Sequence, residues 1–232
     1  MSNQNGLRDA IREHFDAIAP EYDRFKARSH YYYGQLKSLL AELVPDASAS
    51  SVLEIGCGTG ALLAALRPMR GLGIDISESM IRQARDRHRN SPELAFAVGE
   101  AESLDVPGDW NVIIMVDLIE HLYDPEKAIR RISSLMKPGN RLIITWANHL
   151  WAPILHLLEK LRMKMPEGPH VWEPGSTVES RLRASDLEIV ASGTRCLIPA
   201  ALPGSDWINH RLIGLPGMHR LGLIRFLSAV KR

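Results

Sequence analysis

The chain has 232 residues, of which 45% are hydrophobic, so it can bury one sizeable core and fits one elaborated domain better than two. The formal net charge of +1 gives no global basic field that would attract a phosphate backbone, and nucleic acid is not an expected partner. The two cysteines have no metal-ligand spacing, so we expect neither a disulfide framework nor a metal site, and a cytoplasmic location.

The first predicted elements are helices. The N-terminus lacks the apolar stretch of a secretory signal, and no apolar run of the chain is long enough to span a membrane. Residues 7–44 place apolar side chains at helical spacing, with Pro20 and Pro45 as breaks, which predicts two or three helices. We expect residues 1–45 to form a helical lid on a domain at 46–232, the whole being one structural unit.

From Ser51 onward, short apolar strands alternate with amphipathic helical stretches. The expected strands are SVLEI, GLGID, LAFAVG, WNVIIMV and NRLIITWA. Strands that are apolar on both faces and are each followed by a helix are typical of a parallel sheet covered on both sides. The fold class is therefore α/β, a Rossmann-like doubly wound sheet.

After Ala147 the alternation stops. An apolar-rich helical insert is expected at about 148–175, followed by a helix at 176–184 with Ser176 as its cap. Two further strands, LEIVASGTR and IRFLSAVK, flank a second insert at 197–220 that is rich in Pro and Gly. These two strands extend the predicted sheet.

The most informative motif is VLEIGCGTGALL, residues 52–63, a strand that leads through three glycines into a helix. Gly56, Gly58 and Gly60 permit a tight turn and let a ligand lie against bare backbone near a positive helix N-terminus. The loop should hold a cofactor. The pattern alone does not decide which one, because Gly56, Gly58 and Ala61 also satisfy the dinucleotide fingerprint.

Two further loops narrow the ligand. Asp75 ends the next strand about 20 residues after the glycines, where a carboxylate accepts hydrogen bonds from ribose hydroxyls. Ser77 is placed to cap the following helix, so Asp75 is not needed for that role. The segment GEAESLD, residues 99–105, follows the third strand where an adenine edge would lie. Together the three loops describe a pocket for an adenosine.

These residues resemble the class I S-adenosylmethionine (SAM)-dependent methyltransferases, in particular the small-molecule, ubiquinone-biosynthesis-like type. Glu54 and the three glycines match the family's E-x-G-x-G-x-G motif, and the segments VIIMVDLIEHLYDPEKAI and KPGNRLIIT are similar to its later motifs. The resemblance implies SAM as cofactor, S-adenosylhomocysteine as product, and a seven-stranded sheet that is mostly parallel with an antiparallel last strand.

The resemblance also assigns a cofactor site. It places the glycine backbone and the end of the fourth strand beside the methionine part of SAM, Asp75 on the ribose, and Tyr22 in a lid. The residues that it implies are Tyr22, Glu54, Gly56, Cys57, Gly58, Gly60, Asp75, Ile76, Met80, Glu100, Ala101, Glu102, Val116 and Asp117.

Methyl transfer from a sulfonium is an in-line displacement, so the protein mainly positions two reactants, and a strong base is optional. His121 is the best candidate for a catalytic base if the acceptor is a hydroxyl. The alternative is that it contacts SAM or holds its loop. The candidate substrate contacts are Tyr31, Tyr32, Trp146, His149, Trp151 and His170.

The insert is the main clue to the acceptor. Apolar residues from Leu150 to Leu161 recur at helical spacing and either pack on the sheet or border the site. In the second case the acceptor is a small molecule with an apolar portion: a natural product, or a lipid- or glycan-linked metabolite. The cations of this insert and of the C-terminal region could attract a membrane surface or an anionic substrate: Lys160, Arg162, Lys164, Arg211, Arg220, Arg225, Lys231 and Arg232.

Several alternatives stay open at this stage. A NAD-dependent oxidoreductase would share the glycine turn, and a noncatalytic SAM-binding subunit would share the whole cofactor pocket. The fourth strand lacks the Asn/Asp-Pro-Pro-aromatic signature of amino-methylating nucleic-acid enzymes. The layout is also similar to methyltransferases associated with glycosyltransferase partners. The chain could be a monomer or a homodimer.

Overall fold

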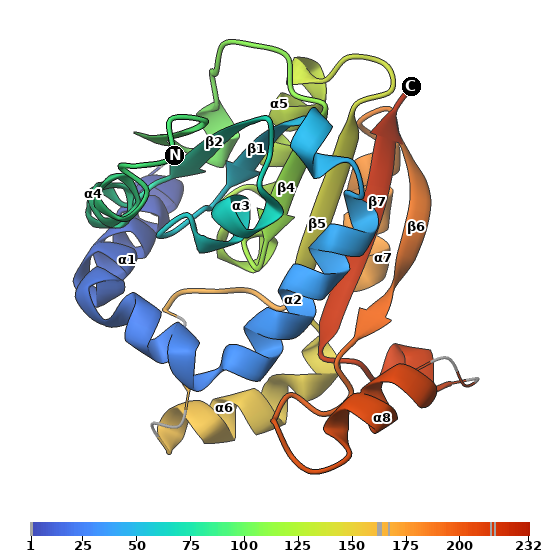
Figure 1. The fold of residues 1–232 in the computed structure, drawn as a ribbon. Helices are drawn as coiled ribbons and strands as arrows, with labels where there is room; N and C mark the ends of the chain where they lie inside the picture. Colours follow the sequence, from blue (N-terminus) through green and yellow to red (C-terminus); the bar gives the residue numbers. More distant parts are fainter. Residues whose placement is uncertain (1, 162–163, 167, 214, 216) are drawn as a thin grey trace.

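In a computed structural model, one seven-stranded sheet lies between two layers of helices (Figure 1). The structure describes all residues except 1, 162–163, 167, 214 and 216. The strands are β1 (Ser51–Ile55), β2 (Arg70–Asp75), β3 (Leu94–Val98), β4 (Val112–Val116), β5 (Arg141–Ala147), β6 (Leu187–Arg195) and β7 (Ile224–Lys231). The α-helices are α1 (Ser2–Arg28), α2 (His30–Leu43), α3 (Ala61–Leu66), α4 (Glu78–Arg87), α5 (Pro125–Leu135), α6 (Ala152–Lys160), α7 (Gly175–Arg183) and α8 (Ser205–Arg211).

The strands pair in the order β3-β2-β1-β4-β5-β7-β6. The pairs among β1 to β5 are parallel, whereas β7 runs antiparallel to both β5 and β6. The seven-stranded Rossmann-like sheet with an antiparallel last strand is thus confirmed. Chain order reverses between β1 and β4, and the crevice at the carboxyl ends of these strands is where open α/β sheets bind ligands.

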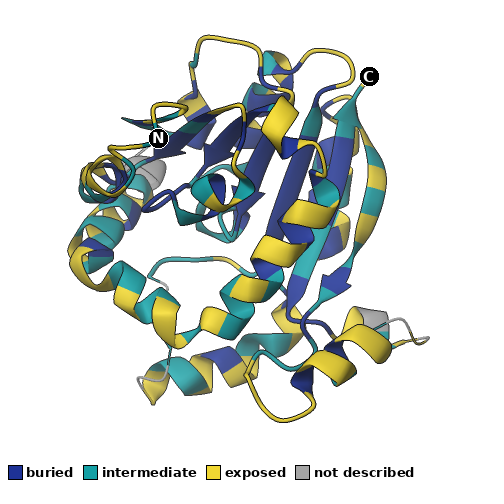
Figure 2. Ribbon diagram, in the orientation of Figure 1, coloured by how far each residue is buried: buried dark blue, intermediate teal, exposed yellow. Residues whose placement is uncertain are grey.

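Both faces of the sheet are covered, which explains the continuous apolar strands. Every residue of β1 and of β4 is buried. On one face the core includes side chains of α2, α3 and α4, and on the other it includes those of α5 and α7 (Figure 2). The amphipathic helices keep their polar residues toward solvent, so burial is confined to one side of each helix.

The N-terminal helix differs from expectation at Pro20, which does not break it. A single helix, α1, runs from Ser2 to Arg28 through this proline. Proline removes one backbone hydrogen bond, but contacts on both sides of it hold the helix in place. Asp16 accepts hydrogen bonds from the Ser77 hydroxyl at 2.6 Å and the Ser79 backbone at 3.0 Å. Beyond the proline, Asp23 accepts one from Thr59 at 2.8 Å.

The C-terminal third follows the predicted strands but not the predicted helix cap. The last two strands, β6 and β7, occupy the expected residues. Ser176 is not a cap, because α7 begins at Gly175 and the carbonyl of Pro174 accepts from Thr177 and Val178. The two inserts contain α6 and α8, which lie together at the lower edge in Figure 1. No helix in the described part of the chain has the length and hydropathy of a transmembrane span.

Candidate active site

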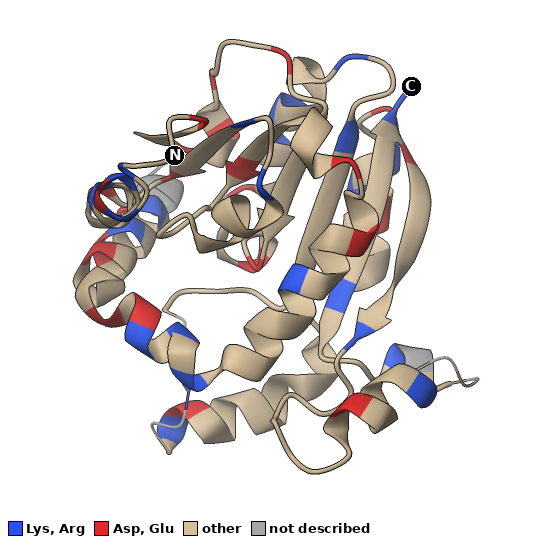
Figure 3. Ribbon diagram, viewed as in Figure 1, with Lys and Arg blue, Asp and Glu red and all other residues tan. Residues whose placement is uncertain are grey.

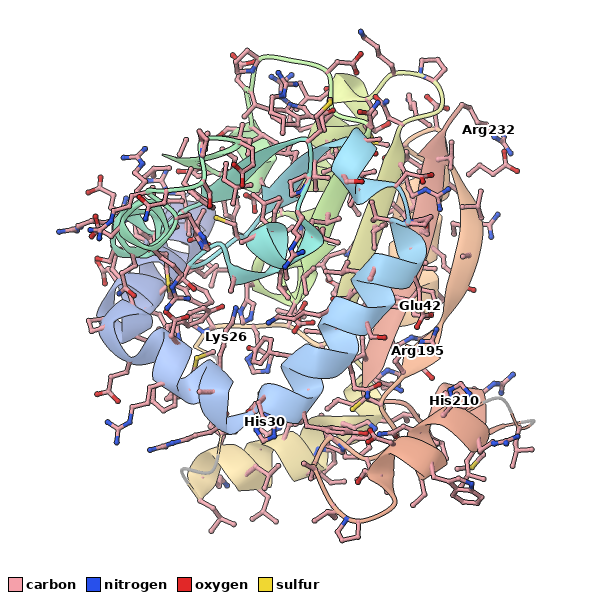
Figure 4. All side chains as sticks on the ribbon, viewed as in Figure 1. Lys26, His30, Glu42, Arg195, His210 and Arg232 are labelled. Atoms are coloured by element: carbon pink, nitrogen blue, oxygen red, sulfur yellow. The ribbon has the colours of Figure 1, made fainter. Side chains whose placement is uncertain are left out.

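A cavity of about 500 Å³ lies at the carboxyl ends of β1, β2 and β4. Turns after these strands form its floor, α1 and α2 form its roof, and α6 and residues 199–201 border its far end. Figure 4 marks Lys26 on α1 and His30 at the start of α2, the two helices of the roof. A cavity of this size accommodates a nucleoside-sized ligand.

The glycine turn after β1 brings bare backbone to the cavity wall. Gly56 has φ +74° and Gly58 has φ +53°, in the left-handed region that glycine adopts without strain. A Cβ at Gly56 would lie 2.8 Å from the Leu118 side chain, and one at Gly58 would lie 3.0 Å from the Tyr22 ring. Side chains at these two positions would fill the space in which a ligand could rest against the turn.

Gly60 has a different role. It does not line the cavity, and a Cβ there would lie only 2.4 Å from the Phe96 ring. Gly60 therefore permits close packing of the start of α3 against β3, and the prediction that it contacts the cofactor directly has no support from its position.

Glu54 stabilises the start of α3, directly after the glycine turn. Its carboxylate is 1% exposed and accepts a hydrogen bond from the backbone N–H of Leu63 at 3.0 Å. Leu63 is the third residue of α3, and Gly60 before that helix has no side chain to cap it, so Glu54 serves as the acceptor. Burial raises the pKa of Glu54 to about 8, and the Lys26 ammonium counteracts part of this rise.

Asp75 joins two loops of the site. Its Oδ2 accepts from the Gly58 N–H at 2.8 Å and its Oδ1 from the Ser77 N–H at 2.9 Å. Each oxygen retains a second lone pair, so the carboxylate can still accept from two hydroxyls of a ligand. Burial raises the pKa of Asp75, while the two backbone hydrogen bonds oppose the rise.

Lys26 is a functional candidate that the sequence reasoning missed. Its Nζ lies 4.4 Å from the ring centroid of Tyr22 and 4.8 Å from that of Tyr33. The positive charge lowers the pKa values of Glu54, Asp75 and Asp117 against the effect of burial, so it acts across the whole floor. In the part of the chain that the structure describes, this ammonium has ring contacts but neither a hydrogen bond nor an ion pair.

At the end near β3, apolar and acidic side chains alternate around the cavity. Ile76, Met80 and Ala101 line it together with Glu100 and Glu102. The Glu102 carboxylate is turned away to the backbone of Tyr123 and Asp124, at 3.1 and 3.4 Å, and so holds the turn before α5. Glu100 is the acidic side chain that remains on this wall, with the Arg8 guanidinium 3.5 Å away.

Asp117 ties the roof to the sheet at the other end of the floor. Its Oδ2 accepts from the Tyr32 hydroxyl at 2.8 Å, and its Oδ1 accepts from Thr145 at 3.2 Å. Burial raises the pKa of Asp117, and both hydrogen bonds favour its charged form. With φ +49°, the residue aims its carboxylate across to α2, so its contacts orient the roof helix.

His121, in the short helix Ile119–His121 after β4, lines the cavity. Its Nδ1 lies 3.2 Å from the Pro169 carbonyl oxygen, which can only accept, so Nδ1 donates and Nε2 keeps its lone pair. Burial lowers the pKa of His121 to about 4, and the ring is neutral at pH 7. The Phe15 and His170 rings contact it with centroids 5.3 and 6.0 Å away.

Glu120 precedes His121 and also lines the cavity. Its Oε1 accepts a long hydrogen bond of 3.5 Å from the Ala147 N–H, whereas its buried Oε2 has no hydrogen-bond partner among the described residues. Burial raises the pKa of Glu120 to about 8, and the nearby Asp117 carboxylate adds to the rise. Glu120 was not predicted as a site residue, although the sequence places its carboxyl group directly before His121, the predicted base.

The structure separates the predicted residues into those that line the cavity and those that do not. The cavity includes His121, Tyr31 and Tyr32, and these cofactor candidates: Tyr22, Glu54, Gly56, Cys57, Gly58, Asp75, Ile76, Met80, Glu100, Ala101, Glu102, Val116 and Asp117. Four predicted substrate contacts and one glycine are not in its lining: Trp146, His149, Trp151, His170 and Gly60.

The four outlying side chains have other partners or positions. Trp146 is 1% exposed in the core and donates to the Glu173 carbonyl at 3.1 Å. His149 faces solvent, and Trp151 donates to the Leu221 carbonyl at 2.7 Å outside the cavity. The His170 ring contacts those of His121 and Trp172, with centroids 6.0 and 5.2 Å away.

Comparisons with known proteins agree with this arrangement. A family model described as "Methyltransferase domain" matches residues 28–192. A ubiquinone biosynthesis O-methyltransferase of Methylococcus capsulatus is 28% identical over 170 residues, covering 65% of this chain and 72% of the relative. The same-named protein of Coxiella burnetii is 29% identical over 126 residues, covering 51% of this chain and only 54% of the relative.

Solved structures share the fold over nearly the whole chain. The magnesium protoporphyrin IX methyltransferase of Synechocystis with bound S-adenosylhomocysteine superposes with a TM-score of 0.70 and 18% identity, covering 96% of this chain and 98% of its own. A SAM-dependent methyltransferase from Thermotoga maritima superposes with a TM-score of 0.72 and 20% identity, covering 96% and 100%.

Proposed function

The chain belongs to the class I SAM-dependent methyltransferases, and we propose that it methylates a small-molecule acceptor that has an apolar portion. Family membership removes the NAD-dependent oxidoreductase as an alternative. The observation that carries the proposal is the division of the cavity. Backbone amides and carboxylates lie at one end, and Leu155, Leu158, Met165 and Leu223 lie at the other.

We assign the polar end to SAM, which supplies a methyl group activated on a sulfonium. Asp75 has two lone pairs left for the ribose hydroxyls, and the bare backbone at Gly56 and Gly58 leaves space for the methionine part. Ile76 and Met80 provide an apolar surface for the adenine. Lys26 pairs with the methionine carboxylate, because it is a cation without an ion pair among the described residues.

We assign the apolar end and the residues beside it to the acceptor. His121 holds an imidazole whose Nε2 keeps a lone pair that can accept the proton of an acceptor hydroxyl as the new bond to the methyl group forms. Burial lowers its pKa to about 4, so in this site it is a weaker base than an ordinary histidine. Tyr32 and Asp117 keep α2 over the reactants, and α1 and α2 act as a lid that excludes water. The acceptor class is supported by the names of the ubiquinone and protoporphyrin relatives.

The direct test is an acceptor screen with methyl-labelled SAM. Phenols, alcohols and amines that carry an alkyl or prenyl tail are incubated with the purified protein, and we expect label in products that partition into organic solvent. Methylation of tailless analogues alone would contradict the apolar part of the proposal. SAM binding without transfer to any acceptor would favour the noncatalytic SAM-binding subunit.

The role of His121 is tested with the best acceptor from that screen. We expect His121→Ala to lower turnover at saturating acceptor by about 10²-fold or more if the acceptor is a hydroxyl. Glu120→Gln is the matched variant, since it changes the neighbouring titratable group. Unchanged turnover in His121→Ala would remove His121 from the chemistry, and a loss confined to Glu120→Gln would transfer the role to that carboxylate.

A further inference from the structure

The helix α6 is apolar on both of its sides. On the inner side, Leu155 is buried and Leu158 half-buried, and both line the cavity. On the outer side lies a second stripe at spacings of four, three and four residues, the repeat of one helix face. Its members are 48–58% exposed: Leu150, Ile154, Leu157 and Leu161. Packing within the chain explains the inner side but leaves about half of the surface of each side chain in the outer stripe exposed.

The second insert extends this apolar surface. A groove between the start of α6 and the region of α8 is lined by Leu150, Trp151, Ile154, Leu197, Ile198, Ile208, Met218 and Leu221. In or directly after the same insert, Leu221 of the groove and three further side chains are 46–62% exposed: Leu202, Trp207, Leu215 and Leu221. We call the outer stripe of α6 together with these four residues the apolar rim. Clusters of exposed large apolar side chains mark interaction sites more often than single ones do.

The apolar rim adjoins the place where the cavity reaches solvent, because Leu202 of the rim directly follows the exposed lining residues Ala200 and Ala201. Most lining residues are buried or half-buried, but Arg28, His30, Ala200 and Ala201 line the cavity and are exposed. These four residues mark the mouth, which lies beside Leu202 of the rim and opposite the inner side of α6. A partner on the rim would therefore sit at the entrance for the acceptor.

Charge around the rim favours an anionic surface. Among the described residues, exposed cations lie at the end of α6 (Lys160), on α8 (Arg211) and in the short helix Met218–Arg220 (Arg220), and Arg28 lies at the mouth. The acidic side chains on α6 and α8 are Glu159 and Asp206, and Arg162 lies outside the described residues. Figure 3 shows both signs of charge on these two helices. Asp206 already accepts a hydrogen bond from Tyr31 at 2.8 Å. The structure also separates this group from cations considered with it in the sequence. Lys164 lines the cavity, Arg225 lies over Trp146, and Lys231 and Arg232 end the sheet far from α6 (Figure 4).

We propose that the apolar rim docks the protein on the surface of an anionic phospholipid bilayer, so that an acceptor with an apolar tail enters the cavity from the membrane. Exposed leucines and a tryptophan flanked by cations are what an interfacial helix uses to enter the headgroup region. A second copy of the chain on the same rim would close the mouth, and this favours a bilayer over a homodimer. The inference rests on the proposed function.

The test is cosedimentation of the purified chain with vesicles. Phosphatidylcholine vesicles containing about 30% phosphatidylglycerol are compared with pure phosphatidylcholine vesicles, at low and high salt. We expect binding to the anionic vesicles that weakens with salt. The double variant Ile154→Glu/Leu157→Glu should reduce the partition coefficient about tenfold or more. Its matched control is Met69→Glu, a residue 61% exposed outside the rim, which should bind as the wild type does.

Two measurements on the same samples keep the outcomes separate. The double variant should keep wild-type affinity for SAM, because neither residue lines the cavity, and it should still methylate a water-soluble acceptor. Absence of vesicle binding by the wild type, or equal binding by the double variant, would overturn the membrane proposal and leave methyl transfer untouched. A wild-type dimer that the double variant converts to a monomer would also overturn it. Vesicle binding without any methyl transfer would instead count against the proposed function.

Discussion

The two ends of the cavity are built in different ways. At the cofactor end, most groups are backbone amides and carboxylates fixed at the ends of β1, β2 and β3, where the Asp75 side chain joins the loops after β1 and β2, and Lys26 of α1 is the exception. At the acceptor end, the lining comes from α1, α2, α6 and the segment 199–201, which are outside the parallel strands. Side-chain contacts such as Tyr32 to Asp117 hold those segments in place.

This difference suggests that one end of the cavity is fixed to bind the cofactor and the other is variable to bind the acceptor. Groups on buried strand ends keep one geometry, which suits a cofactor that never changes. Segments packed from outside can vary without disturbing the sheet, which suits an acceptor that differs between relatives. Changes at the cofactor end should therefore alter stability or SAM affinity, and changes at the acceptor end should alter the acceptor's KM.

The largest expected effect concerns the buried Glu54 and the pH dependence of folding. Its pKa is raised from the ordinary value to about 8, so its contribution to stability is complete below the unfolded pKa and is lost as pH rises through 8. In the wild type, the free energy of unfolding should fall between pH 5 and 8, and Glu54 contributes up to about 1.4 kcal/mol per pH unit to this fall. In Glu54→Gln that contribution should be absent. Urea unfolding across this range measures the slope.

The control for this experiment is Glu93→Gln, which changes an exposed carboxylate. It should leave the pH profile parallel to that of the wild type. If the pH profile of Glu54→Gln is also parallel to that of the wild type, burial does not hold Glu54 in its neutral form in the folded protein, and the raised pKa is contradicted.

The second effect is on SAM affinity. Asp75→Ala removes the acceptor for Gly58 and Ser77 and for the proposed ribose hydroxyls, so SAM binding should weaken by about 1–3 kcal/mol, or about fivefold to over a hundredfold. Calorimetric titration gives the dissociation constant. Asp86→Ala, an exposed carboxylate on α4, should change nothing. Unaltered affinity in Asp75→Ala would overturn the ribose assignment.

The third effect separates recognition of the amino-acid part of SAM from recognition of its adenosine. Lys26→Met keeps the stem between Tyr22 and Tyr33 but removes the ammonium, and SAM affinity should fall about tenfold. Affinity for methylthioadenosine, which lacks the amino-acid part, should not change. Lys37→Met on the exposed side of α2 is the control. An equal loss for both ligands would show that Lys26 supports the fold and does not recognise the carboxylate.

The smallest effect is expected at the acceptor end. Tyr31→Phe removes hydrogen bonds to Asp206 at 2.8 Å and from Asn209 at 2.9 Å, so the free energy of unfolding should fall by about 0.5–1.5 kcal/mol. The acceptor's KM should rise severalfold while SAM affinity stays constant. Tyr33→Phe is the control, since that phenol makes no hydrogen bond within the described residues. A change in SAM affinity for Tyr31→Phe would mean that the two ends are not independent.

The difference between the two ends of the cavity also explains which features could be predicted from the sequence. The strands, their glycine turn and Asp75 were predictable because the pattern is local: an apolar run, then the residues that follow it. The sheet confirms the predicted strands, and most of the predicted cofactor residues line the cavity. Gly60 was assigned to the ligand because the motif does not reveal that Phe96, from another strand, packs against it.

The acceptor end was harder because its contacts join segments distant in sequence. Trp146 lies on β5 but faces the core, and no local pattern distinguishes that from facing the cavity. Lys26 is one cation among many in α1, and only the folded roof places it between two aromatic rings. Pro20 was predicted to break the helix because docking of α1 through Asp16 and Asp23 is tertiary.

Every role proposed for the cavity depends on its binding SAM as the methyl donor. Calorimetric titration of the purified chain with SAM, S-adenosylhomocysteine and NAD in parallel tests it most directly. The account predicts saturable binding of the first two ligands, weakened by Asp75→Ala, and none of NAD. Binding of NAD alone would contradict the claim.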